Sequence, residues 1–295
     1  MNIFITGATG LIGTSLLPHL VEKHQVTALV RNLDTARKKL PNTVNLTTSI
    51  SQYHNLNDFD AVINLAGEPI FDHRWTAAQK QKLLNSRVSL TKHLAYLINQ
   101  SSTPPEVFIS GSATGYYGDN GDVQITESTS PARTFAAMLC KQWENAALQA
   151  ETRVCLIRTG IVLSSKGGAL AKMLPLYRLG LGGKLGNGQR YWGWISIEDM
   201  VQGILFLLEN QHCEGAFNFT APNPLRQSEV NQILGKKLNR PCFAQVPAFV
   251  LKLVLGERSQ LLLDSQNVIP KQLVNAGFEF QYPHFEQAIV HCLNE

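Results

Sequence analysis

The sequence lacks the residue patterns of a disulfide framework and of a metal site. Its five cysteines are widely spaced and form no C-x-x-C pair: Cys140, Cys155, Cys213, Cys242 and Cys292. An odd and scattered set argues against structural disulfides and against zinc, and favours a reducing compartment. The eight histidines form no H-x-x-x-H pair. We therefore expect no metal.

Long apolar runs and blocks of like charge are also missing. No segment reaches eighteen uninterrupted apolar residues, and the chain begins MNIFITGATG without the regions of a signal peptide. This predicts a cytoplasmic protein with no membrane partner. The net charge is +4, from 26 basic and 22 acidic residues, with no basic run of five. Such a balance argues against nucleic acid and leaves a small, anionic substrate open.

What is present is an alternation of apolar β-branched runs with longer amphipathic stretches. The runs read as strands are NIFIT, QVTALV, VNLTT, DAVINLA, EVFISG and RVCLIRT. Alternation of this kind predicts an α/β fold, a Rossmann-like doubly wound parallel sheet with a smaller interleaved C-terminal lobe. We expect residues 1–160 to form the sheet domain, with about 195–220 returning to it. Residues 161–194 and 221–295 form the smaller lobe.

Three helices have clear start signals. The first should run from about Leu11 to His24, with Pro18 either kinking it or facing outward. Thr76 and Gln79 form a capping-box pattern for a helix reaching about Asn99. The segment ISIEDMVQGILFLLEN predicts another helix that begins near two acidic residues.

A glycine turn follows the first strand directly. The sequence Gly7-Ala8-Thr9-Gly10-Leu11-Ile12-Gly13 has the spacing G-x-x-G-x-x-G and leads into a helix. Glycine permits positive φ and close approach of a pyrophosphate, while the helix N-terminus offers free N–H groups. In this strand-turn-helix context the motif predicts a dinucleotide site at Gly7, Thr9, Gly10, Leu11, Ile12 and Gly13.

The end of the second expected strand favours NADP(H) over NAD(H). Arg31 and Asn32 stand where NAD enzymes usually carry an acidic residue for the ribose hydroxyls. A guanidinium can bind the 2′-phosphate through two charge-assisted hydrogen bonds. The alternative is that Arg31 is a solvated charge and that Asp34 serves the ribose of NAD(H).

Further motifs carry a family resemblance. Asn64-Leu65-Ala66-Gly67, the segment GSATGYYG and the segment WISIED are similar to motifs of the extended and atypical short-chain dehydrogenase/reductases, which include nucleotide-sugar epimerases. INLAGEPI, RTGIVLS, LGLGG and SQNVIPKQLVNAGFEFQYP resemble an NAD(P)-binding epimerase-family subgroup with a short C-terminal domain of unknown function. Some relatives in that subgroup carry a cell-division-inhibitor label.

The resemblance implies site residues, and one pair is missing. In the family, Leu65, Ala66 and Gly67 would border the cofactor, and a Ser or Thr, a Tyr and a Lys would transfer a proton. The Tyr and Lys lie four residues apart on one helix face. Aligning Glu144 with a glutamate of the family pattern puts Ala136 and Cys140 in these places. Aligning Lys141 instead puts Ala137 in the place of Tyr, so neither register supplies a phenol.

Other residues are therefore the candidates for proton transfer. Ser112 matches the family serine, with Thr114 as the alternative, and Tyr116 and Tyr117 follow in the same loop. Either tyrosine is a relocated acid or an aromatic residue that packs the pocket. Cys140 is a thiol acid or simply a small buried hydrophobe.

The substrate side is predicted from a glycine-rich segment, GLGGKLGNGQRYWGW, at residues 180–194. Such a loop covers a ligand or forms a mobile surface hairpin. Lys184 and Arg190 in this loop would bind an anionic group. Glu68, after the Asn64 turn, lies where open α/β sheets bind ligands.

Two functions follow. The first is an NADP(H)-binding, epimerase-like oxidoreductase acting on a small molecule, with an acid other than the usual tyrosine. The second is a non-catalytic NADP(H)-binding regulatory or interaction protein, linked to cell division by the relatives' label. A homodimer is possible by analogy with the family.

Overall fold

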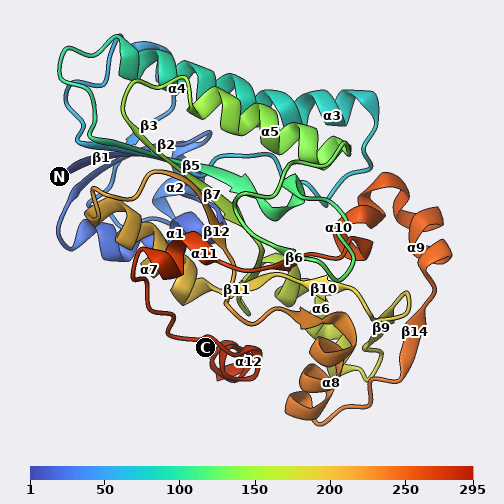
Figure 1. The fold of residues 1–295 in the computed structure, drawn as a ribbon. Coiled ribbons are helices and arrows are strands. Elements are labelled where there is room, and N and C mark those ends of the chain that lie inside the picture. The colour runs from blue at the N-terminus through green and yellow to red at the C-terminus, as the bar shows by residue number, and fades with distance from the viewer. Residues whose placement is uncertain (295) are drawn as a thin grey trace.

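Seven parallel strands form the centre of the molecule (Figure 1). The structure is a computed structural model that describes residues 1–294. In spatial order the strands are β12 (Gly215–Phe219), β7 (Arg153–Thr159), β5 (Val107–Ala113), β4 (Ala61–Asn64), β1 (Asn2–Thr6), β2 (Gln25–Leu29) and β3 (Asn45–Thr47). The order reverses at β1 and β4, which is where a doubly wound sheet binds its ligand. The predicted Rossmann-like fold is confirmed.

Successive side chains of each strand point to opposite faces of the sheet and pack into two hydrophobic cores. Ile3 and Ile5 of β1 pack on one face, whereas Phe4 between them packs on the other. The period of two is that of an extended strand. Because both faces are covered, the buried strand residues are mostly apolar, and the polar exceptions lie toward the carboxyl ends of the strands, as Asn64 of β4 and Arg158 of β7 do.

Helices cover both faces (Figure 1). The cluster containing Ile3 and Ile5 is completed by α1 (Leu11–Val21), α7 (Ile197–Glu209) and α11 (Lys271–Asn275). The cluster containing Phe4 is completed by α4 (Leu90–Asn99) and α5 (Phe135–Ala147). The remaining helices of the sheet domain are α2 (Leu33–Arg37), α3 (Ala77–Leu84) and the 3-10 turns η1 (Ile50–Gln52) and η3 (Thr114–Tyr116).

The helix start signals hold, but two helices differ from the prediction. Thr76 accepts a hydrogen bond from the backbone N–H of Gln79 at 3.2 Å and begins α3. The expected long helix is then interrupted by a π-helical turn, η2 (Asn85–Ser89), before α4 begins. The first helix ends at Val21, three residues earlier than expected, and Pro18 lies within it facing solvent.

The smaller lobe has its own core, built around Trp192 and Trp194. Its helices are α6 (Gly168–Arg178), α8 (Gln227–Leu238), α9 (Ala248–Leu255), η4 (Gly256–Ser259), α10 (Gln260–Leu263) and α12 (Phe285–Asn294). Two-stranded pairs join β8 (Ile161–Leu163) with β11 (Trp194–Ser196), β9 (Gly183–Leu185) with β14 (Ala244–Val246), β10 (Tyr191–Trp192) with β13 (Leu225–Arg226), and β6 (Gln124–Ile125) with β15 (Asn267–Val268).

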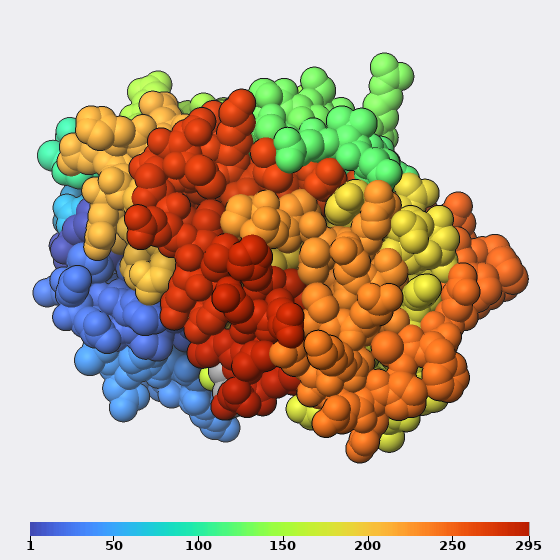
Figure 2. Space-filling model, turned by 60° about the horizontal axis from the view of Figure 1, so that its bottom comes forward, coloured from blue at the N-terminus to red at the C-terminus, as the bar shows by residue number. Residues whose placement is uncertain are grey.

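The carboxyl-terminal segment connects the two lobes. Figure 2 shows these red residues crossing the surface between gold residues of the sheet domain and orange residues of the smaller lobe. Asp199 of α7 fixes this segment, because its carboxylate accepts hydrogen bonds from the backbone N–H groups of Gln281 (2.7 Å) and Tyr282 (3.0 Å). Within residues 1–294, no helix combines the length and the apolar character needed to span a bilayer.

Candidate functional site

The glycine turn is shaped for a ligand that must approach the backbone. Gly7 has φ of +74°, and a Cβ there would lie 2.5 Å from the carbonyl carbon of Leu65. A Cβ on Gly13 would lie 2.5 Å from the carbonyl oxygen of Gly7. Neither position accepts a side chain, so the turn between β1 and α1 stays narrow. The first N–H groups of α1 face this turn and suit an anionic pyrophosphate.

A buried hydrogen-bond chain fixes the loop after β4, which lies beside the glycine turn. The Thr6 hydroxyl donates to Asn64 Oδ1 at 2.7 Å, and Asn64 Nδ2 donates to the Thr91 hydroxyl at 2.7 Å. The backbone N–H of Ala66 donates to the Thr6 hydroxyl at 3.3 Å. These bonds hold Leu65, Ala66 and Gly67 against the glycine turn, so the predicted cofactor residues of β1 and β4 lie together.

Arg31 and Asn32 have different roles at the end of β2. The Arg31 side chain is 91% exposed, and its Nη1 lies 3.8 Å from Glu68 Oε2. The Asn32 side chain instead accepts from the backbone N–H of Thr35 at 2.8 Å and caps α2. Of the two, Arg31 therefore has the exposed guanidinium that a 2′-phosphate needs, and the Asn32 side chain is engaged in the cap.

Glu68, which was predicted to bind substrate, lies next to Arg31 at the end of β2. Its carboxylate is buried and lies 2.8 Å from Lys82 Nζ, in addition to the contact with Arg31. The hydrogen bond from Lys82 holds the pKa of Glu68 below its ordinary value. The side chain predicted to bind substrate thus contacts the two cations at this edge of the groove.

Helix α5, which has no Tyr or Lys at the family positions, carries a buried carboxylate that organises the end of β5. Ser112 donates its hydroxyl proton to Glu144 Oε1 at 2.6 Å. Arg158 of β7 donates to both oxygens of Glu144, from Nε and from Nη2, each at 2.8 Å. A bidentate pair of this kind is rigid and specific. Sequence reasoning used Glu144 only to align the helix and did not identify Arg158, one of two arginines in the strand RVCLIRT, as its partner.

The two tyrosines after Ser112 lie in different environments. The Tyr117 hydroxyl donates to Asn218 Oδ1 at 2.6 Å and accepts from Arg158 Nη1 at 2.9 Å, and the side chain is 2% exposed. Burial raises the pKa of Tyr117 to about 12. Tyr116 is half-buried, and the Arg158 guanidinium lies 3.8 Å from its ring centroid. Burial also raises the pKa of Tyr116, so its phenol is protonated at neutral pH.

Cys140 lies inside the molecule beside Ser112. Burial raises the pKa of its thiol to about 11, with the nearby Glu144 carboxylate adding to the effect. A neutral buried thiol is a poor nucleophile. Lys141, one residue on, faces solvent. Helix α5 therefore presents neither a phenol nor an ammonium group to the end of β5.

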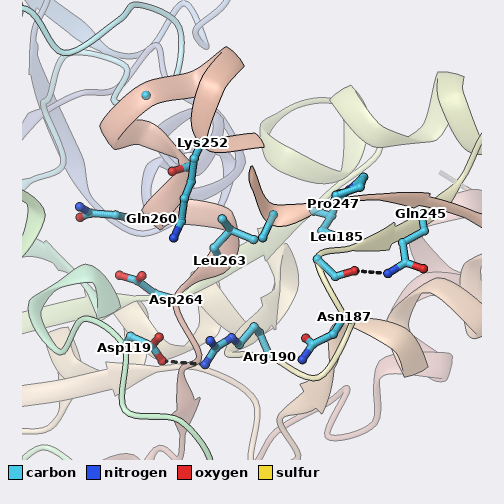
Figure 3. A pocket seen from close by; sticks show the side chains of 14 residues that line it. Asp119, Leu185, Asn187, Arg190, Gln245, Pro247, Lys252, Gln260, Leu263 and Asp264 are labelled. Atoms are coloured by element: carbon cyan, nitrogen blue, oxygen red, sulfur yellow. Dashed lines mark hydrogen bonds and ion pairs between the residues drawn. The ribbon is translucent and has the colours of Figure 1, made fainter. Parts of the chain in front are cut away.

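A cavity of about 700 Å³ opens between the loop after η3 and the smaller lobe (Figure 3). Its lining includes Asp119 from that loop, Arg190 from the glycine-rich segment, Lys252 from α9 and Asp264 after α10. Arg190 Nη1 lies 3.3 Å from Asp119 Oδ1. Of the two predicted cations, Arg190 thus lines the cavity and Lys184 does not; the Lys184 stem lies beside Gly188.

The cavity wall contains a carboxyl group with altered acidity. Burial, with repulsion from Asp119, raises the pKa of Asp264 to about 6. Figure 3 shows Lys252 descending into the same side of the cavity. Asp119, Lys252 and Asp264 were missed in the sequence because β9 and β14 come together only in the fold. A lone lysine inside the apolar stretch AFVLKLVL was the one available signal.

The glycine-rich segment is held by pairing with the smaller lobe. Gly183 of β9 pairs with Ala244 of β14, and a Cβ on Gly183 would lie 2.1 Å from the Ala244 carbonyl oxygen. Trp192 of β10 pairs with Leu225 of β13. Both strands of this segment are therefore paired, and Arg190 between them lines the cavity.

The tail joins the candidate catalytic loop to this cavity. The Ser265 backbone N–H donates to Asp119 Oδ1 at 3.1 Å, and the Thr114 hydroxyl donates to Gln266 Oε1 at 2.6 Å. Thr114, the alternative to Ser112, is thus engaged with the tail. The loop that carries Tyr116 and the wall that carries Asp264 are therefore one connected structure.

Comparison with known proteins agrees with this architecture. Residues 3–219 match the model of the NAD dependent epimerase/dehydratase family. The chain belongs to this family. Residues 246–292 match a separate domain of unknown function, DUF1731. This match covers α9 to α11 and most of α12, and it includes Lys252 and Asp264 at the cavity.

Several family members are similar over almost the whole chain. The "Epimerase family protein SDR39U1 homolog, chloroplastic" of Arabidopsis thaliana is 38% identical, covering 98% of this chain and 86% of that protein. Epimerase family protein SAR0825 of Staphylococcus aureus (strain MRSA252) is 38% identical, covering 99% and 98%. The predicted family resemblance, including the subgroup with the C-terminal domain, is confirmed.

Solved structures show the same fold. Human epimerase family protein SDR39U1 (isoform2), crystallised with NADPH, matches with a TM-score of 0.92 and 30% identity over 100% of both chains. A nucleoside-diphosphate sugar epimerase from Corynebacterium glutamicum matches with a TM-score of 0.79 and 30% identity, covering 99% of this chain and 58% of that one. The NADPH of the human structure agrees with the cofactor that Arg31 predicts.

Proposed function

We propose that this protein is an NADP(H)-dependent, epimerase-like oxidoreductase that acts on a small anionic molecule with a carbonyl or hydroxyl group. The cavity carries the proposal, because hydrogen bonds join the loop of Tyr116 to the cavity wall, and the charged side chains of Arg190 and Lys252 line the same cavity. An anionic group of the substrate would bind these cations. The glycine turn and the loop after β4, which would hold the cofactor, lie at the carboxyl ends of β1 and β4, and β5 is the next strand of the sheet.

The cofactor part rests on three features of the groove. Gly7 and Gly13 leave room for a pyrophosphate, and the exposed guanidinium of Arg31 suits a 2′-phosphate. The human relative at 30% identity is a complex with NADPH. Bound NADPH would supply a hydride, and the protein must then supply a proton to the oxygen of the reduced carbonyl.

Tyr116 is the proton donor that the geometry favours. Ser112 donates its proton to Glu144, and the Tyr117 hydroxyl is enclosed between Asn218 and Arg158. Tyr116 is half-buried, protonated at neutral pH and stacked on a fixed cation. Proton transfer from such a group requires hydrogen-bond reach to the substrate oxygen. Ser112 and Tyr117 then orient the loop instead of donating the proton.

The proposal is tested by a screen of small anionic carbonyl compounds for NADPH oxidation. The wild-type protein should oxidise NADPH faster than its spontaneous decay with at least one compound. Tyr116→Phe should lower kcat by about 100-fold or more, as loss of a general acid does. Tyr117→Phe removes a buried hydroxyl nearby and is the matched control. A Tyr116→Phe variant with unchanged kcat would rule out the assignment.

A second candidate function is a non-catalytic NADP(H)-binding regulator. The outward surface of α9 and Phe243, which directly precedes β14, favour it, with exposed fractions of 87% for Phe243, 71% for Phe249 and 79% for Leu253. Exposed apolar side chains of this size can contact a protein partner. Tight NADPH binding without turnover across the whole screen would favour this function over the first.

A further inference from the structure

Helix α9 is apolar, but its outer side is not covered by the rest of the chain. Each of the eight residues of AFVLKLVL is exposed or only partly buried. A surface helix of a globular protein normally buries its apolar face and turns polar residues outward. In α9, however, Phe249, Leu253 and Val254 are all more than half exposed. The outward side of this helix therefore leaves large apolar side chains in water.

The segment before α9 adds a further apolar side chain. Exposed and partly buried residues alternate from Pro241 to Pro247, as in a strand with one side turned toward the protein. Phe243 lies on the outward side of this segment. Its exposed fraction is the highest among the large apolar side chains of residues 1–294. Because α9 begins directly after Pro247, the apolar side chains of the segment and of the helix follow one another along the surface.

The end of α6 lies beside this segment. Arg240 Nε donates to the Arg178 carbonyl oxygen at 2.9 Å, and β9, which follows α6, pairs with β14. Leu179 and Leu181, between α6 and β9, are exposed. The four most exposed large apolar side chains of residues 1–294 therefore belong to two segments that are neighbours in the fold. We call this set, with two further members, the α9 surface: Leu179, Leu181, Phe243, Phe249, Leu253 and Val254.

The charges of these two segments have one sign. Residues 152–197 and residues 230–256 contain no acidic residue, although the whole chain has 22. Arg178 and Arg240 are exposed, and within residues 1–294 neither forms an ion pair with a carboxylate. Glu257, which directly follows the second segment, is paired with Lys80. The α9 surface is thus apolar and bordered by unpaired positive charge.

Projecting apolar side chains bordered by cations fit the surface of an anionic membrane. There, apolar side chains enter the boundary between headgroups and acyl chains while cations contact the lipid phosphates, and the two contributions add. A second copy of the chain fits less well, because a two-fold contact through this surface would bring the same unpaired cations of both copies together. Figure 2 shows orange residues of the smaller lobe projecting at the right-hand edge of the molecule, a shape that suits insertion.

We propose that the α9 surface docks this protein on an anionic lipid membrane. Phe243, Phe249 and Leu253 enter the boundary below the headgroups, and Arg178 and Arg240 contact the lipid phosphates. The sequence predicted no membrane partner because it has no spanning segment, but docking of this kind needs only surface residues. The cavity also has lining residues from α9, so docking places one of its walls at the membrane. The proposal goes beyond the proposed function and does not depend on NADP(H) binding.

Co-sedimentation with lipid vesicles tests the α9 surface. One set of vesicles contains equal parts of phosphatidylglycerol and phosphatidylcholine, and the other contains phosphatidylcholine alone. We expect binding to the anionic vesicles to be at least about tenfold tighter, and to weaken when NaCl is raised from about 0.1 M to about 0.5 M.

Two variants with matched controls assign the binding to this surface. Leu253→Ser should weaken binding to anionic vesicles about tenfold, because an inserted apolar group is lost. Leu148→Ser changes an exposed leucine outside the α9 surface and should have no effect. Arg178→Gln should weaken binding about fivefold through the loss of one cation at the lipid phosphates. Arg133→Gln, at another exposed position, is its control.

Equal binding to the two kinds of vesicle, or binding to neither, would overturn the proposal. Equal losses in Leu253→Ser and Leu148→Ser would also overturn it, because the membrane contact would then lie elsewhere. Circular dichroism verifies that each variant is folded, and Phe243→Ser replaces Leu253→Ser if the latter is not. A dimer that Leu253→Ser dissociates in analytical ultracentrifugation, without vesicle binding by the wild type, would assign the surface to a second copy and contradict the proposal. Failure to bind NADPH contradicts the proposed function and leaves the vesicle result unaffected.

Discussion

The glycine turn and helix α5 are both parts of the groove, but they follow the family pattern to different degrees. At the glycine turn, backbone geometry leaves no alternative, since a Cβ on Gly7 or Gly13 would meet backbone atoms at 2.5 Å. On α5 the usual phenol and ammonium are replaced by Ala136 and Cys140, and a buried network of Ser112, Glu144 and Arg158 lies in the same region. Cofactor binding is constrained by the backbone, whereas proton transfer depends on side chains that can be exchanged or moved to other elements.

The largest expected effect is on stability, at the buried pair on α5. Glu144→Gln removes the charge that compensates Arg158 and changes the acceptor of Ser112. Leaving a buried charge unpaired costs about 3–5 kcal/mol. We expect a loss of this size in the free energy of unfolding, measured by urea denaturation monitored by circular dichroism.

The exposed pair of Lys172 and Asp72 is the control. Asp72→Asn should cost about 0–1 kcal/mol, as surface ion pairs do. If Glu144→Gln lowered the free energy of unfolding no more than Asp72→Asn does, the buried network of Glu144 would not stabilise the fold. The proposed difference between α5 and the glycine turn would then be wrong.

The next effect is on the cofactor at the glycine turn. Gly13→Ala places a Cβ against the Gly7 carbonyl, which forces the turn to open and costs about 1–3 kcal/mol of strain. We expect NADPH affinity to fall by about 100-fold, measured by isothermal titration calorimetry. Ser15→Ala makes the same side chain in the same helix and should leave the affinity near wild type. A folded Gly13→Ala variant with full affinity would contradict the described turn.

A smaller effect should separate the two nicotinamide cofactors. Arg31→Ala removes the exposed guanidinium, and we expect NADPH affinity to fall about tenfold while NADH affinity stays unchanged. The reason is that only NADPH carries the 2′-phosphate. Asp34→Ala is the matched variant, because Asp34 is the alternative ribose partner; it should leave NADPH affinity unchanged. Equal losses for both cofactors in Arg31→Ala would refute the assignment of Arg31.

The smallest effect concerns pH and Asp264. The folded state raises the pKa of Asp264 to about 6, so the folded protein binds this proton more tightly than the unfolded chain does. The contribution of Asp264 to the free energy of unfolding is therefore fully present at low pH. It is lost as the pH rises from about 4 to 6. One pKa unit corresponds to about 1.4 kcal/mol, and water access to the half-buried carboxyl reduces the total to the order of 1 kcal/mol.

Asp264→Asn should remove this pH dependence and raise stability above pH 6, measured by urea denaturation between pH 4 and 8. Asp58→Asn, an exposed position, is the control. If the free energy of unfolding of the wild-type protein instead rose between pH 4 and 6, and Asp264→Asn abolished that rise, the pKa of Asp264 would be lowered by folding. This result would exclude a raised pKa.

The fold and the cofactor turn were predictable because their signals are local. The strand RVCLIRT begins and ends where β7 does, and Thr76 caps α3 as its capping-box pattern predicts. The glycine turn is one continuous heptapeptide. These features depend on helix and strand propensity, on hydrophobic periodicity and on the conformational freedom of glycine. Each of these can be read from a short segment of sequence.

The rest depends on contacts between distant residues. Ser112 and Glu144 are 32 positions apart, and Thr114 meets Gln266 across 152 positions. The π-helical turn η2 has no propensity signal of its own. The cavity exists because β9 pairs with β14 about 60 residues later in the chain. Charges within apolar stretches, Arg158 in RVCLIRT and Lys252 in AFVLKLVL, were the local traces of these features.

Titration of the wild-type protein with NADPH and then with NADH in a calorimeter tests the central claim, that the glycine turn and Arg31 form an NADP(H) site. The account predicts saturable binding of one NADPH per chain, with NADH at least about tenfold weaker. Absence of heat with both cofactors, confirmed by unchanged thermal unfolding in their presence, would contradict it.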